Sequence, residues 1–332
     1  MEAQGSPLLD LREVMVQSFI EAVEEGVDLV VLVSDSTSTS RIAPFKERFP
    51  ERLIDVGIAE QNLVGVAAGL ALGGHVAVTA NAAPFLVARA NEQVKNDVCY
   101  SATNVKLVGL NAGMAYGPLA STHHAIDDIS IMRGLGNILI LAPSDPVEAR
   151  QIFDFALRCE GPVYIRMDSA AYPTLHSGGY RFRPGTVDVL QRGGDLTFAA
   201  TGSVVREAVA AAQELKREGI AVDVLNVSSI RPLEPGTILD SLSATGRVIS
   251  VEEHSLHGGL GSLVAELIAE NAVPARLVRL GIPEGRFAKA GPRAEIWKWC
   301  RIDRAGILDA ARQCLEIPPP CGTTRNPETA PV

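Results

Sequence analysis

Short runs of apolar residues, each ending in polar residues or glycine, alternate along this chain with stretches of helical length. The segments 28–35 (DLVVLVSD) and 104–111 (NVKLVGLN) are typical runs. A strand that reads as an uninterrupted apolar run is buried on both faces, as in a parallel sheet covered by helices. The alternation therefore predicts an α/β fold with mostly parallel sheets flanked by helices.

A stretch rich in Gly and Arg, residues 176–195, interrupts this alternation. With 332 residues the chain is long enough for two domains. We place the first domain at residues 1–180 and the second at 181–316, and we expect the Pro- and Thr-rich segment 317–332 to be a disordered tail. The longer predicted helices lie at 10–25, 59–72, 84–100, 204–218, 261–270 and 304–315.

Composition excludes several classes of function. The net charge is −9, from 30 basic and 39 acidic residues, which disfavours a broad nucleic-acid surface. No apolar run is long enough to span a bilayer, and the N-terminal residues lack a secretory pattern. The five cysteines form no CxxC pair and are expected as free thiols. We expect a cytoplasmic protein that binds neither nucleic acid nor membrane.

Glu60 begins a predicted helix of small and apolar residues, and no Lys or Arg lies next to it in the sequence. A carboxylate at a helix start ordinarily complements the helix dipole. The apolar flanks, however, predict that this carboxylate is buried. Burial favours a carboxyl group that shares or holds a proton, so Glu60 is a candidate for chemistry.

The segment 55–72 (DVGIAEQNLVGVAAGLAL) resembles the cofactor-activating segment of the transketolase family of thiamine-diphosphate enzymes. It is also similar to the corresponding segment of deoxyxylulose-phosphate synthase. The resemblance continues in order through segments 84–97, 121–149, 162–168 and 248–266, and covers nearly the whole chain to about Leu315. It implies a thiamine-diphosphate pyrimidine-binding domain followed by a transketolase C-terminal domain.

The resemblance implies roles for three residues near the cofactor. In the family, the glutamate at the position of Glu60 hydrogen-bonds a ring nitrogen of the aminopyrimidine and promotes its imino tautomer. The exocyclic nitrogen then removes the thiazolium proton. An aromatic ring at the position of Phe85 stacks on the aminopyrimidine, and Gln61 is a further cofactor-binding candidate. The cofactor ring would then be the partner that Glu60 lacks.

The resemblance also implies substrate-binding residues. His123, in the segment STHHA, corresponds to a family histidine that faces the substrate and acts as general acid or base. Arg166, in YIRMD, corresponds to an arginine that binds the acceptor phosphate. Arg12 and Arg89 resemble arginines of similar split enzymes, although a salt bridge or a solvated face explains either equally well. We take Arg12 as the weaker phosphate candidate.

Three positions depart from the family pattern. Asn111 stands where the family usually has a histidine, and we align Leu119 with an aspartate that recognises a sugar hydroxyl. His124 replaces a glutamine and has no assigned role. Asn111 remains a substrate-binding candidate, and the changes at these positions leave a different acceptor or a simpler 2-oxo acid donor open.

The larger departure is the absence of the Gly-Asp-Gly motif with which the family binds diphosphate and Mg²⁺. Without it this chain is expected to hold no metal of its own. A second, N-terminal subunit would supply that domain and hold Mg²⁺, which predicts an α₂β₂ assembly. The chain is then expected to be the β subunit of a two-component transketolase, transferring a two-carbon ketol unit from a ketose to an aldehyde through thiamine diphosphate.

Three alternatives remain open. One is a thiamine-diphosphate carboligase with a 2-oxo acid donor such as pyruvate, which would release CO₂. Another is a non-catalytic scaffold subunit, which Glu60, Phe85 and His123 disfavour. The third is the β subunit of a 2-oxo acid dehydrogenase, which we rank lower because GIAEQN and THHAIDDI look more like transketolase.

Overall fold

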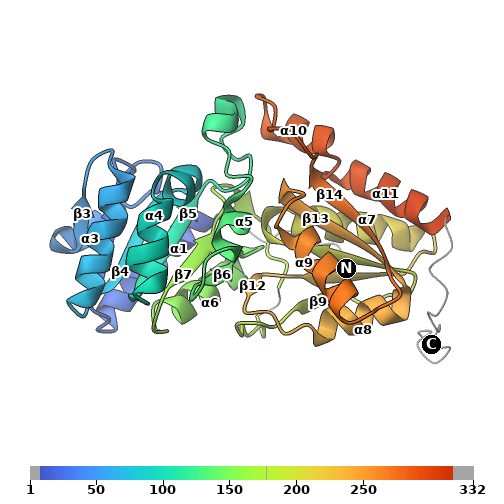
Figure 1. Cartoon of the computed structure of the whole chain (residues 1–332), viewed down its shortest axis with the longest axis horizontal. Helices are drawn as coiled ribbons and strands as arrows, with labels where there is room; N and C mark the ends of the chain where they lie inside the picture. The colour runs from blue at the N-terminus through green and yellow to red at the C-terminus, as the bar shows by residue number, and fades with distance from the viewer. Residues whose placement is uncertain (1–7, 177, 317–332) are drawn as a thin grey trace.

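The computed structural model describes residues 8–176 and 178–316, so the predicted tail at 317–332 lies outside the described residues. Figure 1 shows two α/β units side by side, each with a central sheet and helices packed against it. This arrangement confirms the predicted fold class. The two longer sheets run through the middle of the two halves, and a short pair of strands, β1 (Leu9–Asp10) and β8 (Ala171–Tyr172), forms a small ribbon.

The first sheet has seven strands, and all neighbouring pairs are parallel except the pair at one edge. That edge strand comes from the second half of the sequence and pairs antiparallel with β6, which the sequence did not lead us to expect. In spatial order the strands are β12 (Ser229–Arg231), β6 (Leu139–Leu141), β7 (Val163–Arg166), β5 (Val105–Leu110), β4 (Val76–Ala82), β2 (Leu29–Val33) and β3 (Leu53–Asp55).

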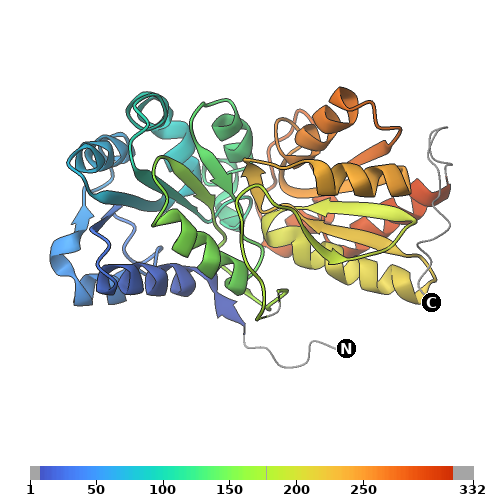
Figure 2. The same cartoon turned by 90° about the horizontal axis from the view of Figure 1, so that it is seen from below.

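Helices cover both faces of this sheet, which is why its central strands are apolar on both sides. Figure 2 shows α1 and α6 on one face and the helices around α3 on the other. The helices of this half are α1 (Leu11–Glu24), α2 (Ala43–Arg48), α3 (Glu60–Leu72), α4 (Asn91–Gln93), α5 (Asp128–Arg133) and α6 (Pro146–Ala156).

The second sheet has five strands, of which only β9 is antiparallel to its neighbour. Their order is β14 (Arg276–Ile282), β13 (Arg247–Ser255), β10 (Leu196–Ala200), β11 (Val222–Asn226) and β9 (Asp188–Gln191). The helices are α7 (Val205–Arg217), α8 (Gly236–Thr245), α9 (Leu260–Glu270), α10 (Arg293–Cys300) and α11 (Arg304–Glu316).

The apolar core continues from one half into the other. Ile129 and Ile140 of the first half and Ile230 and Leu260 of the second belong to one cluster of buried side chains. The two halves are therefore held together by core packing as well as by the shared β12–β6 pairing.

The segment predicted as one helix at 84–100 is helical but irregular. Short α4 is flanked by the wide turns Phe85–Arg89 and Val94–Tyr100, in which the Ala90 N–H donates to Phe85 O, five residues back. Wide turns of this kind change the direction in which side chains leave a helix, and they occur often at functional sites. Here the first one carries both Phe85 and Arg89.

In the described part of the chain, no helix is long and apolar enough to cross a membrane. Cys99, Cys159, Cys300 and Cys314 are free thiols, and Cys321 lies outside the described residues.

Candidate functional site

Glu60 is the first residue of α3 and is only 3% exposed, which confirms that this carboxylate is buried. Its Oε2 accepts a hydrogen bond from Nη1 of Arg89 at 2.6 Å. The expectation that no Lys or Arg neutralises Glu60 is therefore wrong. Arg89 comes from a different element, 29 residues along the chain, and only the tertiary fold brings the two side chains together.

The other carboxylate oxygen of Glu60 is still available. Within residues 8–176 and 178–316, Oε1 accepts no hydrogen bond, whereas Oε2 is bound by Arg89. A carboxylate oxygen has lone pairs for an N–H or protonated ring nitrogen. Glu60 therefore offers a buried but unsaturated acceptor at the start of α3.

Phe85 lies next to this carboxylate through the same arginine. The guanidinium carbon of Arg89 is 4.5 Å from the centroid of the Phe85 ring, within cation–π range, while its Nη1 bonds Glu60. Phe85 is half-buried, so part of its ring stays accessible. An accessible aromatic ring beside an unsaturated carboxylate oxygen fits a flat nitrogen heterocycle that stacks and donates at the same time.

His123 extends this arrangement on the other side of Phe85. Its ring lies edge-on between Phe85 and Tyr116, with centroid distances of 5.1 and 5.3 Å. The Thr122 hydroxyl lies 3.1 Å from Leu119 O, which can only accept, and 2.9 Å from His123 Nδ1. The hydroxyl proton therefore goes to the carbonyl and Nδ1–H donates to Thr122 Oγ1, which leaves Nε2 as the basic nitrogen.

Asn111 follows β5 at the start of the glycine-rich loop 111–124. Its φ of +54° is in the left-handed region, which Asn tolerates better than most residues, and this explains an asparagine at the position. Burial raises the pKa of Tyr116 above its usual value, although a hydrogen bond from Asn111 and the charge of Arg12 oppose this shift. Tyr116 thus connects Asn111 to His123, and the charge of Arg12 acts on the same hydroxyl.

Arg12 is held in place by its own helix start. Nε and Nη2 donate to the two oxygens of Asp10 at 3.0 and 2.7 Å, and Nη1 donates to Thr39 O at 3.0 Å. Asp10 is also the N-cap of α1, where it accepts from Arg12 N. The salt bridge that the sequence left open for Arg12 is present, and its side chain keeps 15% exposure.

Arg166 lies apart from these residues, between Asp128 of the first half and Glu253 of the second. Its side chain is 4% exposed, its Nε bonds the carboxylate of Asp128, and its Nη2 donates to Glu253 O at 2.9 Å. A guanidinium with these partners joins the two halves of the chain. The prediction that Arg166 binds an acceptor phosphate receives no support from this arrangement.

The remaining sequence candidates occupy the rim or the loop interior. Gln61 and Leu119 are exposed, and no hydrogen bond or ring contact joins either side chain to the Phe85–His123 pair in the described region. His124 is buried, and its Nε2 donates to Gly117 O at 3.1 Å. Burial lowers the pKa of His124, so the ring is neutral and fastens the loop to itself.

The loop that carries His123 is supported by the second half of the chain, which sequence reasoning missed. Glu253, at the end of β13, accepts from Met114 N at 3.1 Å and from Arg293 Nε at 2.9 Å. Gly113 has a φ of +65°, which favours glycine, and a Cβ there would also lie 2.6 Å from the Glu253 carboxyl carbon. The only sequence signal was the pair of adjacent glutamates in VEEH, which the resemblance marked without assigning a role.

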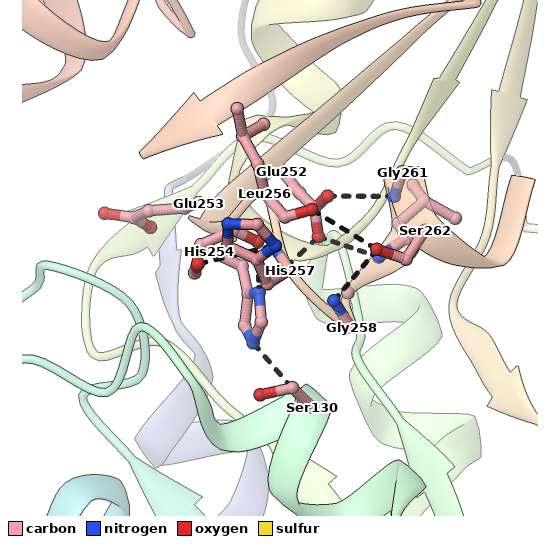
Figure 3. Close-up of polar contacts among 12 residues, drawn as sticks. Ser130, Glu252, Glu253, His254, Leu256, His257, Gly258, Gly261 and Ser262 are labelled. Carbon is pink, nitrogen blue, oxygen red and sulfur yellow. Dashed lines mark hydrogen bonds and ion pairs between the residues drawn. The ribbon is translucent and has the colours of Figure 1, made fainter. Parts of the chain in front are cut away.

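Figure 3 shows the neighbouring residues of that motif. Glu252 caps α9, with Gly261 N donating to its Oε1 at 2.8 Å. His254 points to the first half of the chain, where its Nε2 lies 3.4 Å from Ser130 N, and its Nδ1 lies 2.7 Å from Ser255 O. Because a carbonyl only accepts, His254 is protonated at Nδ1 and receives the Ser130 N–H at Nε2.

Comparison with known proteins agrees with this architecture. Family models described as "Transketolase, pyrimidine binding domain" and "Transketolase, C-terminal domain" match residues 8–174 and 185–307. An apulose-4-phosphate transketolase subunit of Actinobacillus succinogenes is 58% identical over 301 residues, covering 91% of this chain and 97% of that protein. The 6-deoxy-6-sulfo-D-fructose transketolase subunit of a Clostridium species is 38% identical, covering 92% and 94%.

Among solved structures, one described as a split gene transketolase, inactive beta4 tetramer, superposes with a TM-score of 0.83 at 35% identity. It covers 93% of this chain and 99% of that one. The fold and these matches define a two-domain chain with a pyrimidine-binding half and a transketolase C-terminal half. The chain belongs to the transketolase family, whose enzymes use thiamine diphosphate, and corresponds to the β subunit of a split transketolase, as the sequence predicted.

Proposed function

We propose that this chain provides the pyrimidine-binding side of a transketolase active site through Glu60, Phe85 and His123. The observation that carries the proposal is the continuous set of contacts from Glu60 through Arg89 and Phe85 to His123. A scaffold subunit would need neither an unsaturated buried carboxylate nor an accessible ring beside it. The enzyme transfers a two-carbon ketol unit from a ketose to an aldehyde.

Thiamine diphosphate, when bound, supplies the carbon nucleophile and the electron sink of this reaction. Glu60 would accept a hydrogen bond from the aminopyrimidine through its free oxygen, and Phe85 would orient that ring by stacking. Arg89 holds the Glu60 carboxylate in a fixed position through Oε2, so the free oxygen keeps its direction. We assign Arg89 a positioning role because it contacts the carboxylate of Glu60 and the aromatic ring of Phe85.

His123 carries the proton transfers at the substrate. Its Nδ1–H is held by Thr122, so Nε2 is free to accept a proton from a substrate hydroxyl and return it. Asn111, Tyr116 and Arg12 lie beyond His123 and form the side of the site toward which we orient the polar end of the acceptor. Arg12 replaces Arg166 as our preferred phosphate ligand, because Arg166 is buried against Asp128.

A second subunit completes the site. The chain lacks the Gly-Asp-Gly motif, so we propose that the partner holds Mg²⁺ and the diphosphate and that the assembly is α₂β₂ in the cytoplasm. A relative described as an inactive beta4 tetramer supports the need for such a partner. The related subunits are named for apulose-4-phosphate and 6-deoxy-6-sulfo-D-fructose, so the substrate class is a ketose with an anionic phosphate or sulfonate group.

The test is a reconstitution with a candidate partner that carries Gly-Asp-Gly. Calorimetry should detect thiamine diphosphate with Mg²⁺ only when both chains are present. A ketose phosphate donor should then yield a two-carbon transfer product without CO₂. Turnover of pyruvate with CO₂ release would replace the transketolase assignment with the carboligase, and tight cofactor binding by the lone chain would contradict the divided site.

The matching variant is Glu60→Gln in the reconstituted enzyme. We expect kcat to fall by at least about 100-fold, because a carboxamide cannot share a proton with the ring nitrogen. The unfolding midpoint of the lone chain should change little, and His257→Gln, at an exposed histidine, is the control. Unchanged turnover of Glu60→Gln would favour a scaffold subunit.

A further inference from the structure

A separate cluster of titratable side chains lies where the two halves of the chain meet. Asp145 and Glu148 come from the start of α6, Asp188 from the start of β9, and His176 and Tyr180 from the segment between the halves. None of these residues belongs to the arrangement around Glu60 and His123. The catalytic proposal leaves this cluster without a purpose.

His176 is the centre of the cluster. Its side chain is 4% exposed, and its Nδ1 lies 3.1 Å from Asp145 Oδ2. Its Nε2 lies 3.7 Å from Asp188 Oδ2, too far for a hydrogen bond, and neither ring nitrogen has a hydrogen-bond partner of acceptable geometry in the described residues. A buried ring nitrogen without a partner is costly unless a further group binds it.

The contacts of the Tyr180 hydroxyl also indicate that a positively charged group is missing from the cluster. This hydroxyl lies 3.0 Å from Glu148 Oε1 and 3.0 Å from Asp188 Oδ2. One hydroxyl has one proton, so it can donate to only one of these two carboxylate oxygens, and Glu148 Oε1 also accepts from Asn226 Nδ2 at 2.9 Å. The other oxygen faces a lone pair, which is unfavourable unless a positive charge lies between them.

The buried charges do not balance. Three carboxylates surround one imidazole, and in residues 8–176 and 178–316 no Lys or Arg forms an ion pair with any of the three. Even a protonated His176 leaves two negative charges in excess.

We propose that Glu148, His176 and Asp188 bind a divalent transition-metal ion of the Zn²⁺ type. One ligand atom from each residue lies within 4.8 Å of the others. Bond lengths near 2 Å place the ligands of a tetrahedral Zn²⁺ about 3.3 Å apart, so the ligand atoms must draw together by up to about 1.5 Å to bind the ion. An imidazole nitrogen with two carboxylate oxygens suits Zn²⁺ or Mn²⁺ better than Mg²⁺ or Ca²⁺.

Asp145 completes the geometry as an orienting residue. Its Oδ2 lies at Nδ1 of His176, so Nε2 is the nitrogen turned toward Asp188. A carboxylate behind a metal-binding histidine fixes the ring and increases its basicity. The same oxygen also accepts from the backbone of Leu175 and His176, so the segment between the halves is anchored beside the ion.

The proposed metal site can be tested independently of catalysis. The tag-free full chain is stripped with a chelator, incubated with Zn²⁺, Mn²⁺ or Co²⁺ without thiamine diphosphate, and assayed for metal by mass spectrometry. We expect about one Zn²⁺ per chain, visible absorption bands with Co²⁺, and a metal-dependent rise in Tm. His176→Gln and Asp188→Asn should each weaken Zn²⁺ binding at least about tenfold.

The control is His257→Gln, because His257 also lies beside a carboxylate, 3.8 Å from Glu284, but at the surface. The His257→Gln variant should bind Zn²⁺ as tightly as the natural chain does. Circular dichroism checks that each variant folds. If His176→Gln does not fold, the Zn²⁺ affinity of Asp188→Asn decides between the outcomes. A natural chain that retains no metal, or variants that bind Zn²⁺ undiminished, would overturn the proposal.

Discussion

Two buried charge clusters join the halves of this chain, and they are neutralised differently. In the first, Asp168 and Glu253 share the guanidinium of Arg293, which bonds both carboxylates. In the second, neither Glu148 nor Asp188 pairs with a Lys or Arg within the described residues. Asp188 lies beside His176 and the Tyr180 hydroxyl, whereas Glu148 accepts from Tyr180, Ser144 and Asn226. The first cluster carries its cation within the sequence. The second has a place for one that the sequence does not supply.

This difference separates two kinds of polar interface. A pair of carboxylates around an arginine is complete when the chain folds, and it fixes the loop with His123 in one position through Met114 and Glu253. A cluster with more carboxylates than cations gains stability when a proton or a metal ion enters it. The two clusters are therefore expected to respond differently to mutation, pH and added metal.

The largest effect is expected from removing the internal cation. Arg293→Ala leaves Asp168 and Glu253 buried without a counter-ion, and we expect a loss of about 3–5 kcal/mol in the free energy of unfolding. Urea unfolding measures it. Arg312→Ala, at an exposed pair with Glu218, is the matched control and should leave the transition in place. Equal midpoints for both variants would show that the first cluster does not need its arginine.

The second prediction concerns pH in the metal-free chain. The pKa of His176 in the fold, about 10, lies above its ordinary value of 6.5, so protonated His176 stabilises the fold fully below about pH 6.5. This stabilisation is lost as pH rises toward 10. The groups that face the ring are Asp145, Glu148, Asp188 and Tyr180.

The measurement is the difference in unfolding free energy between the natural chain and His176→Gln, taken with chelator from pH 6 to 10. Adding Zn²⁺ should reverse the slope, because the metal requires a neutral imidazole and binds more tightly at higher pH. A difference that is flat with pH in chelator would show that His176 is not held by the carboxylates.

The smallest effect is expected at a carboxylate that needs no cation. Glu252 is fully buried, but the backbone N–H groups of Leu260 and Gly261 at the start of α9 bond both its oxygens. Glu252→Gln keeps one acceptor and should cost about 1 kcal/mol, as for the loss of a helix cap. Chemical denaturation of this variant beside Arg293→Ala gives the comparison, and a larger loss at Glu252 would reverse the order.

The parts of the molecule that the sequence predicted are those set by local pattern. Apolar runs marked the buried strands, and the small-residue stretch after Glu60 became α3 with the expected start. The helix α6 begins with a local signal of the same kind, because Asp145 is its N-cap and Pro146 its first residue. Local rules are enough here because periodicity and capping act within a few residues.

The parts that the sequence did not predict depend on contacts between distant residues. Arg89 beside Glu60, Glu253 beside Met114 and the position of Tyr116 next to His123 each join separate elements. An aromatic residue in a glycine-rich loop was the one available signal for Tyr116. The substrate and cofactor roles of Glu60, Gln61, Phe85, Asn111, His123 and Arg12 stay predictions, as does that of Arg166.

The strand β12 has a consequence for how such a chain can be divided. It starts beyond the proposed boundary at residue 180 but closes the open edge of the first sheet beside β6. A cut between the two halves would expose the backbone N–H and C=O groups of β6 and invite pairing with other chains. Encoding this polypeptide and a diphosphate-binding partner as separate chains leaves the first sheet intact. Dividing the polypeptide between its two halves would instead leave an unpaired strand edge.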